Sequence, residues 1–249
     1  MTVVNPYAAP KAALADETVP LDADYVPGGQ ARPASHGWAW IAEGWHLFKR
    51  QPGIWIGIVL LLLAIMLAAA FIPVLGGLAL SLFVPVFAAG IVIGCKALET
   101  GRDLEIGHLF AGFRERTGPL VGIGALYLGA SLVIMLVVGL GIGAGTRTTM
   151  TYFLALLVAM ALLLPVVMAI WFAAPLAVFH GHGALEAMKG SFSGCLKNVM
   201  PFLWYSVIFV ALGFLASLPL LLGWLVLGPV LAASIYTAYR DIYLRPRGM

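Results

Sequence analysis

Formal charge is confined to a few short stretches of this 249-residue chain. All eleven Asp and Glu residues, and all but one of the fourteen Lys and Arg residues, fall in four polar segments: 1–52, 96–116, 186–197 and 240–249. The runs between them, 53–95, 117–146, 148–185 and 198–239, contain no Asp, Glu, Lys or Arg. Because a charged side chain is costly in hydrocarbon, this pattern is typical of an integral membrane protein.

The lengths of the uncharged runs predict six membrane-spanning helices. A helix needs about 20 apolar residues to cross about 30 Å of hydrocarbon. The runs 53–95 and 198–239 are about twice that length and have Pro and Gly near the middle, so each predicts a helical hairpin. The expected spans are 53–72, 77–97, 118–142, 150–175, 200–217 and 222–243. The runs lack period-two alternation, so we expect an all-α transmembrane bundle.

The distribution of basic residues predicts how the bundle is oriented. Six spans place both termini on one side, and only Arg147 among the Lys and Arg residues falls on the other side. The positive-inside rule then predicts that both termini are cytoplasmic. No basic cluster stands away from the spans, so we expect membrane lipids as partners and no nucleic acid.

Composition divides the chain into a tail and a membrane domain. Residues 1–34 are rich in Ala and Pro and contain few large apolar side chains, which predicts a disordered cytoplasmic tail. Residues 35–249 form the helical membrane domain.

Three short amphipathic helices are expected, each before an odd-numbered span. Apolar side chains recur at helical spacing in three groups: Ile41, Trp45 and Phe48; Ile106, Phe110 and Phe113; Leu185, Met188, Phe192 and Leu196. Such helices suit the headgroup boundary of the bilayer. Their outer faces are candidate contact surfaces for a protein partner or a second copy of this chain.

The even-numbered spans share a Pro-Val pair, which indicates internal repeats. Pro85 precedes Lys96 by eleven residues, and Pro229 precedes Arg240 by the same interval. Pro165 repeats the pair, but Leu176 stands where the basic residue would be. We expect three parallel copies of one unit, made of an interfacial helix, a span, a turn and a kinked span.

The sequence predicts no catalytic, cofactor-binding or metal-binding residues. His180 and His182, with Glu186 and Cys195 nearby, are the only cluster that resembles a metal site, but their spacing matches no established ligand pattern. Hydroxyls within the spans are expected to pack or to bond to helix carbonyls rather than to act as nucleophiles. They are Ser81, Ser131, Thr151, Ser206 and Ser217. The glycine-rich segment 139–145 ends a span and is not expected to bind phosphate.

Several segments resemble a family of bacterial polytopic inner-membrane proteins of uncharacterised function. The similar segments are 5–10 (NPYAAP), 41–52 (IAEGWHLFKRQP), 105–113 (EIGHLFAGF), 185–189 (LEAMK) and 239–242 (YRDI). The resemblance covers nearly the whole chain and implies a location in the bacterial inner membrane. It brings no catalytic residues with it.

Three functions are compatible with these features. The first is a non-enzymatic scaffold, assembly or envelope-homeostasis factor that uses its interfacial helices to contact a partner. The alternative is a carrier or flippase for a neutral or lipidic substrate, since no span interior contains Asp, Glu, Lys, Arg or His. The least favoured is an enzyme that acts on a lipid through His180, His182 and Glu186.

Reporter fusions test the predicted orientation. A reporter that is active only outside the cytoplasm, inserted at 73–77 or 218–223, should be active, because both turns are expected on the outer side. The same reporter fused at the C-terminus should be inactive. An inactive reporter at either turn would contradict the six-span topology.

Overall fold

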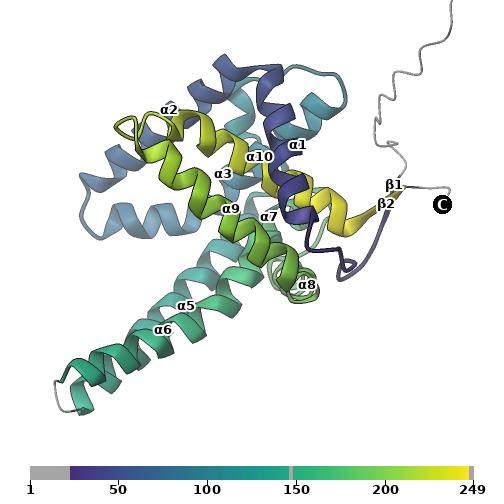
Figure 1. Ribbon diagram of the computed structural model, residues 1–249. Helices are drawn as coiled ribbons and strands as arrows, with labels where there is room; N and C mark the ends of the chain where they lie inside the picture. Colours follow the sequence, from purple (N-terminus) through teal and green to yellow (C-terminus); the bar gives the residue numbers. More distant parts are fainter. Residues whose placement is uncertain (1–22, 146–147, 247–249) are drawn as a thin grey trace, which may run out of the picture.

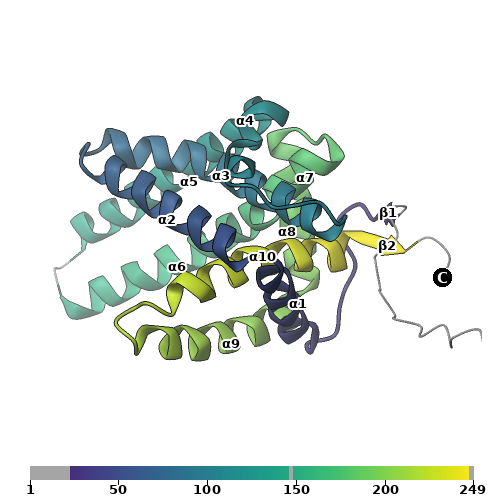
Figure 2. The same ribbon diagram turned by 90° about the horizontal axis from the view of Figure 1, so that it is seen from above.

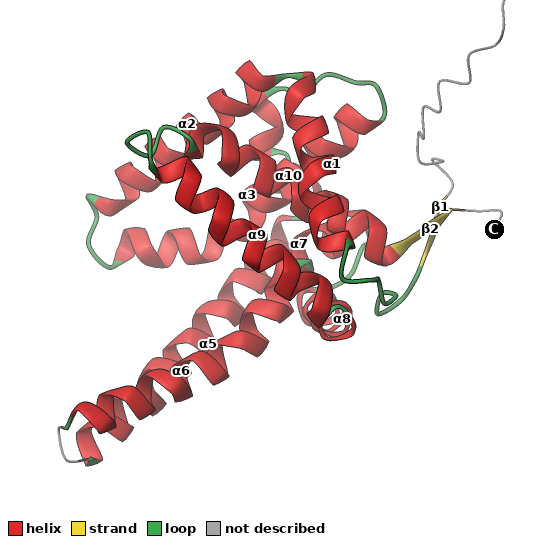
Figure 3. Ribbon diagram, in the orientation of Figure 1, coloured by secondary structure: helices red, strands yellow, loops and turns green. Residues whose placement is uncertain are grey.

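The fold is almost entirely helical, as the sequence predicts. The computed structural model describes residues 23–145 and 148–246. The helices are α1 (His36–Arg50), α2 (Pro52–Ala70), α3 (Leu75–Glu99), the 3₁₀ helix η1 (Ile106–Phe110), α4 (Gly112–Glu115), α5 (Thr117–Ala144), α6 (Thr149–Trp171), α7 (Ala173–His180), α8 (Ala184–Lys197), α9 (Val199–Ser217) and α10 (Trp224–Tyr243). Strands β1 (Ala23–Tyr25) and β2 (Leu244–Pro246) form a small antiparallel sheet (Figure 3).

In the part of the chain that the structure describes, five stretches of helix are long and apolar enough to cross a membrane. They are Pro52–Ala70, Leu75–Glu99, Thr117–Gly143, Thr149–His180 and Val199–Ser217. The fourth continues through α7, past the end at 175 that the sequence predicts. Helix α10 covers most of the expected sixth span and has 20 residues. It is not among the five stretches, because Arg240 and Asp241 in its last turns lower its hydropathy. The sixth span stays a prediction.

The long helices form three hairpins that point the same way. These are α2–α3, α5–α6 and α9–α10, and they spread apart from a common centre (Figure 1). The turns of α2–α3 and α9–α10 lie at one end of the molecule, together with the last residues of α5 and the first of α6, and β1 and β2 lie at the other (Figure 2). We call these the turn end and the polar end, because α1, η1, α4 and α8 gather at the second. Arg147 lies outside the described residues.

The short amphipathic segments pack in a cyclic order on the kinked helices. Helix α1 packs on α10, η1 and α4 pack on α3, and α8 packs on α6. Two of these contacts use a glycine in the same way. A Cβ atom at Gly44 would lie 2.6 Å from the carbonyl oxygen of Val230, and one at Gly112 would overlap the carbonyl of Val86. Val230 and Val86 both directly follow the helix-interior prolines noted above.

This packing supports the predicted repeat without establishing it. Each amphipathic segment contacts the kinked helix of the preceding unit, and the first unit contacts the last. Three copies around an axis along the membrane normal would produce such an order. The second segment differs, since η1 and α4 replace a continuous helix. The repeat stays a prediction.

Residues 23–34, which the sequence assigns to a disordered tail, are held by hydrogen bonds to the helical domain. The amide of Val26 donates to the carbonyl of Tyr243 (2.8 Å), and the amide of Gln30 donates to that of Ile242 (2.9 Å). Backbone pairing with β2 and α10 orders this segment, and composition alone does not reveal it. Residues 1–22, including the NPYAAP motif, lie outside the described residues.

The close approach of α1 to α10 predicts a stability difference between two glycine variants. Gly44→Ala places a methyl group against the α10 backbone and should destabilise the protein by about 1–3 kcal/mol. Gly53→Ala is the control, because a Cβ there meets no atom within 4 Å. It should be neutral or stabilising by up to about 1 kcal/mol. Thermal unfolding in mild detergent measures both, and equal midpoints would contradict the α1–α10 packing.

Candidate functional site: a lateral apolar cleft

An apolar cleft of about 650 Å³ opens between α6, α9 and α10. Its lining residues are Leu164, Val167, Met168, Trp171, Cys195, Val199, Phe202, Leu203, Tyr205, Ser206, Phe209, Leu231, Ala232 and Ile235. None of these side chains is charged. The Tyr205 hydroxyl is bonded to Ser234 (2.8 Å), and Ser206 Oγ donates to the carbonyl of Phe202 (2.8 Å). The cleft therefore offers an apolar surface whose hydroxyls already have partners.

The cleft exists because the three hairpins do not close into a complete ring. Helices α3 and α5 pack closely, and a Cβ atom at Gly124 would lie 2.5 Å from the carbonyl oxygen of Leu82. Helix α10 packs on α2 and α3, which joins the third hairpin to the first. Within the described residues, the backbone of α6 lies close to those of α5, α7 and α8 but approaches those of α9 and α10 at isolated points at most. The second and third hairpins thus remain apart.

Aromatic side chains close the cleft at the polar end. The ring centroid of Phe202 lies 5.8 Å from those of both Trp171 and Phe172. The rings of Trp171 and Tyr205 meet edge to face, with centroids 6.5 Å apart. These contacts join the last turn of α6 to the first turns of α9. The cleft thus extends from this aromatic floor along the polar-end halves of both helices.

Beside the cleft, an ionic network joins α10 to α1 and α3. The Arg240 guanidinium pairs with Glu43 of α1 (2.5 Å) and with Glu99 of α3. The Tyr236 hydroxyl donates to the same Glu99 carboxylate. Burial raises the pKa of Glu43, although the charge of Arg240 opposes the shift. Removing Arg240 would leave two partly buried carboxylates without their cation.

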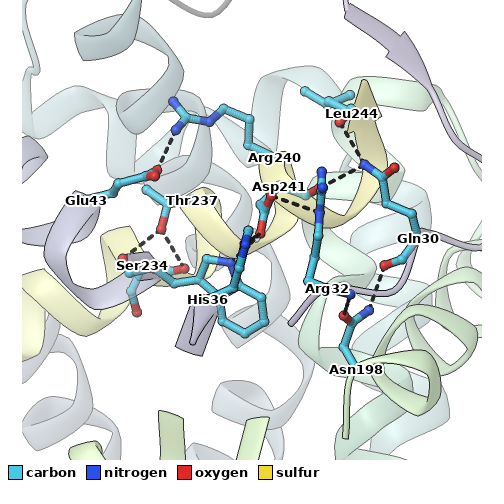
Figure 4. Close-up of polar contacts among 11 residues, drawn as sticks. Gln30, Arg32, His36, Glu43, Asn198, Ser234, Thr237, Arg240, Asp241 and Leu244 are labelled. Atoms are coloured by element: carbon cyan, nitrogen blue, oxygen red, sulfur yellow. Dashed lines mark hydrogen bonds and ion pairs between the residues drawn. The ribbon is translucent and has the colours of Figure 1, made fainter. Parts of the chain in front are cut away.

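The neighbouring Asp241 anchors the segment before α1 (Figure 4). Its carboxylate pairs with Arg32 (2.9 Å) and bonds to His36 Nδ1 (2.7 Å) and Trp40 Nε1 (2.8 Å). The Asn198 side chain accepts from the Arg32 amide (2.8 Å) and donates to the carbonyl of Gln30, which adds the start of α9. The network therefore has a structural role at the polar end.

The histidine cluster that the sequence singled out is not assembled as a ligand set. His180 Nε2 bonds to the Tyr239 hydroxyl (2.6 Å), and its ring stacks on Tyr25. His182 Nε2 lies 3.8 Å from Glu186. Cys195 instead lines the cleft. In residues 23–145 and 148–246, no group of three or more His, Cys, Asp or Glu could hold a metal ion.

The hydroxyls within the spans are largely committed to helix carbonyls. Ser81 donates to the carbonyl of Gly77 (2.9 Å), and Ser217 donates to that of Gly213 (2.8 Å). Ser206 forms the equivalent bond within α9. The expectation of back-bonding is confirmed for these three. Ser131 Oγ is buried and has no such partner, and Thr151 Oγ1 lies 3.1 Å from the hydroxyl of Thr148.

Comparison with known proteins supports the membrane assignment. The chain is 28% identical, over 224 residues, to a protein of Burkholderia thailandensis that is named a "probable inner membrane protein". The match covers 82% of this chain and 81% of the relative. No family model matches the chain, and no solved structure matches it.

The chain is an integral membrane protein. Its apolar helices and its similarity to an inner-membrane protein agree on this point. The name of the relative also supports a location in the inner membrane. The side on which the termini lie stays a prediction.

Sequence reasoning missed both the cleft and the ionic network. The cleft depends on which helices fail to meet, and no local pattern encodes that. The residues of the network, Glu43, Glu99 and Arg240, are far apart in the sequence. Taken alone, each looks like an ordinary charged residue next to a membrane span. The matched Pro-to-basic intervals did place Arg240 at a corresponding point of a repeat, but they did not identify its partners.

The buried thiol of the cleft predicts slow alkylation. Burial raises the pKa of Cys195 to about 12, because the thiolate is disfavoured away from water. The thiolate is the reactive form, so at pH 7.5 Cys195 should react at least about a hundredfold more slowly than an ordinary cysteine with a pKa of about 8.5. Iodoacetamide labelling of the Cys95→Ala protein in membranes measures the rate.

An exposed thiol on the same helix provides the comparison. Glu186→Cys, in a Cys95→Ala and Cys195→Ala background, places it in the first turn of α8, where Glu186 is exposed. Equal labelling rates at the two positions would contradict the buried environment of Cys195.

Proposed function

We propose that this protein binds an acyl chain of a membrane lipid in the α6–α9–α10 cleft. The observation that carries the proposal is a lateral apolar opening that α10 lines together with α6 and α9, two helices that are long and apolar enough to span the bilayer. An opening of this kind faces lipid rather than water. Its volume lies within the range of about 300–1,000 Å³ that is usual for ligand sites.

The chemistry of the lining favours an apolar occupant over a polar one. A charged or strongly polar cargo would lose its hydration and find no charged partner among the lining residues. The hydroxyls of Tyr205 and Ser206 are already bonded within the protein. An acyl chain needs no polar partner and buries its methylene groups against leucine, valine and aromatic side chains. Binding without a reaction is consistent with this surface.

The position of the cleft indicates the leaflet from which the lipid comes. On α9 the lining residues fall between Val199 and Phe209, and on α6 between Leu164 and Trp171. Both sets lie in the half nearer the polar end. With the orientation that the basic residues predict, this half lies in the cytoplasmic leaflet. A carrier or flippase for a lipidic substrate would use the same cleft as its entry site.

A scaffold or assembly role is the second candidate. Ile106, Phe110 and Phe113, in η1 and α4, are all exposed although they are large and apolar. A protein partner or a second copy of the chain could cover them, and so could the headgroup boundary. A stoichiometric partner that co-purifies in mild detergent, and is lost when all three become Ser, would favour this candidate.

Photo-crosslinking tests the proposed lipid site. The protein is reconstituted with a phospholipid that has a diazirine on its acyl chain, and the crosslinked residues are mapped by mass spectrometry. We expect crosslinks concentrated on the lining residues of α6, α9 and α10. Ser206→Trp, which fills the cleft, should reduce these crosslinks at least about fivefold, because a bulky indole replaces the chain.

Val210→Trp is the matched control on the same helix. Val210 is 67% exposed and does not line the cleft, so the indole should leave the cleft crosslinks unchanged. Crosslinks spread evenly over all exposed faces, with no effect of Ser206→Trp, would overturn the proposal.

A further inference from the structure

A single hydroxyl group interrupts the series of backbone hydrogen bonds between α6 and α7. Ser191 Oγ of α8 donates to the carbonyl of Met168 (2.7 Å), and the amide of Phe172 donates to Ser191 Oγ (2.9 Å). In a continuous α-helix the amide of Phe172 would bond directly to the carbonyl of Met168. The hydroxyl thus stands between two backbone groups that would otherwise pair.

The backbone leaves the helical conformation at this point. Phe172 has φ −110° and ψ 7°, and it separates α6 from α7 within one continuous apolar stretch. Pro175 weakens the same turn, because it has no amide to donate to the carbonyl of Trp171. A side chain inserted into the ladder is a recognised cause of helix kinks.

The junction lies at the floor of the cleft. Met168 and Trp171 line the cleft, and Phe172 packs on Phe202 and Tyr243. Ser191 is fully buried, and its helix α8 packs on both α6 and α7. Any change in direction at Phe172 would move α6 relative to α9. Beyond the ring contacts at the junction, the backbones of these two helices approach each other at isolated points at most within the described residues.

We propose that Ser191 sets the angle of the α5–α6 hairpin and thereby holds the cleft open. The hydroxyl can bond to both the amide of Phe172 and the carbonyl of Met168 only while these two groups are not bonded directly to each other. Without it, the two groups can both be satisfied by pairing with each other, which would straighten α6 into α7. Ser191 is then a positioning residue for the site in the proposed function, on which this inference rests.

Distance measurements between spin labels test the hinge directly. Labels are placed at Tyr152→Cys on α6 and Phe214→Cys on α9, both exposed positions, in a Cys95→Ala background that keeps the buried Cys195. Tyr152 lies 20 residues from Phe172, which is a lever of about 30 Å. A change of about 20° at the junction therefore moves the label by about 10 Å. We expect Ser191→Ala to shift the mean distance by about this amount in lipid nanodiscs.

Two variants distinguish the hydroxyl from a general loss of packing. Ser193→Ala, on the same helix, removes a hydroxyl that bonds to Gly28 instead and should leave the distance unchanged. Ser191→Thr keeps the hydroxyl and should retain the original distance. An unchanged distance in Ser191→Ala would overturn the hinge, and so would the same shift in Ser191→Thr. The second comparison remains informative if Ser191→Ala does not fold.

The two proposals fail in different ways. Loss of cleft-specific crosslinking in the unmodified protein would remove the lipid site without touching the distance result. An unaltered distance in Ser191→Ala, with crosslinks still at the cleft, would leave lipid binding in place and remove the hinge. A shifted distance together with fewer cleft crosslinks in Ser191→Ala supports both.

Discussion

The pairing of Arg240 with Glu43 and Glu99 holds the architecture together at the polar end. A cation in the last turns of α10 is tolerated beside membrane spans only if its charge is compensated. The compensating carboxylates come from α1 and α3, so satisfying one charge joins the first and third hairpins. Asp241, one residue later, joins the segment before α1 to the same helix. Helix α10 becomes the centre on which the bundle is assembled.

Small residues allow the remaining helices to approach this centre. Lipid gives helices no hydrophobic reason to associate, so close backbone contact has to supply the stabilisation. Gly44 against α10 and Gly112 against α3 both provide it, at corresponding points after a proline. Among the described residues, close backbone contact is lacking along the boundary between the second and third hairpins. The first hairpin thus packs closely on both the second and the third hairpin, whereas a cleft separates the second from the third. We propose that lipid enters this cleft.

The proposed hinge at Phe172 lies beside the cleft between the second and third hairpins. The α5–α6 hairpin projects away from α9, and no described residue of α6 is buried (Figure 1). Its direction depends on α8, whose Ser191 replaces a backbone hydrogen bond at the junction. One buried serine at the interface could therefore influence a membrane-embedded cleft over several helical turns. Rearrangement of this hydroxyl requires no ionisable group within the spans.

The sequence by itself determined the helical membrane architecture, because hydrocarbon excludes charge and the charge-free runs have the length of spans and hairpins. It also located the short helices, since a 3.6-residue apolar period is a local property. Tertiary structure alone decided that residues 23–34 are ordered, that His180 bonds to Tyr239 and that Glu43 meets Arg240. The cleft, too, was decided only there. These features depend on which helices meet, and groups far apart in the sequence carry no local signal of their partners.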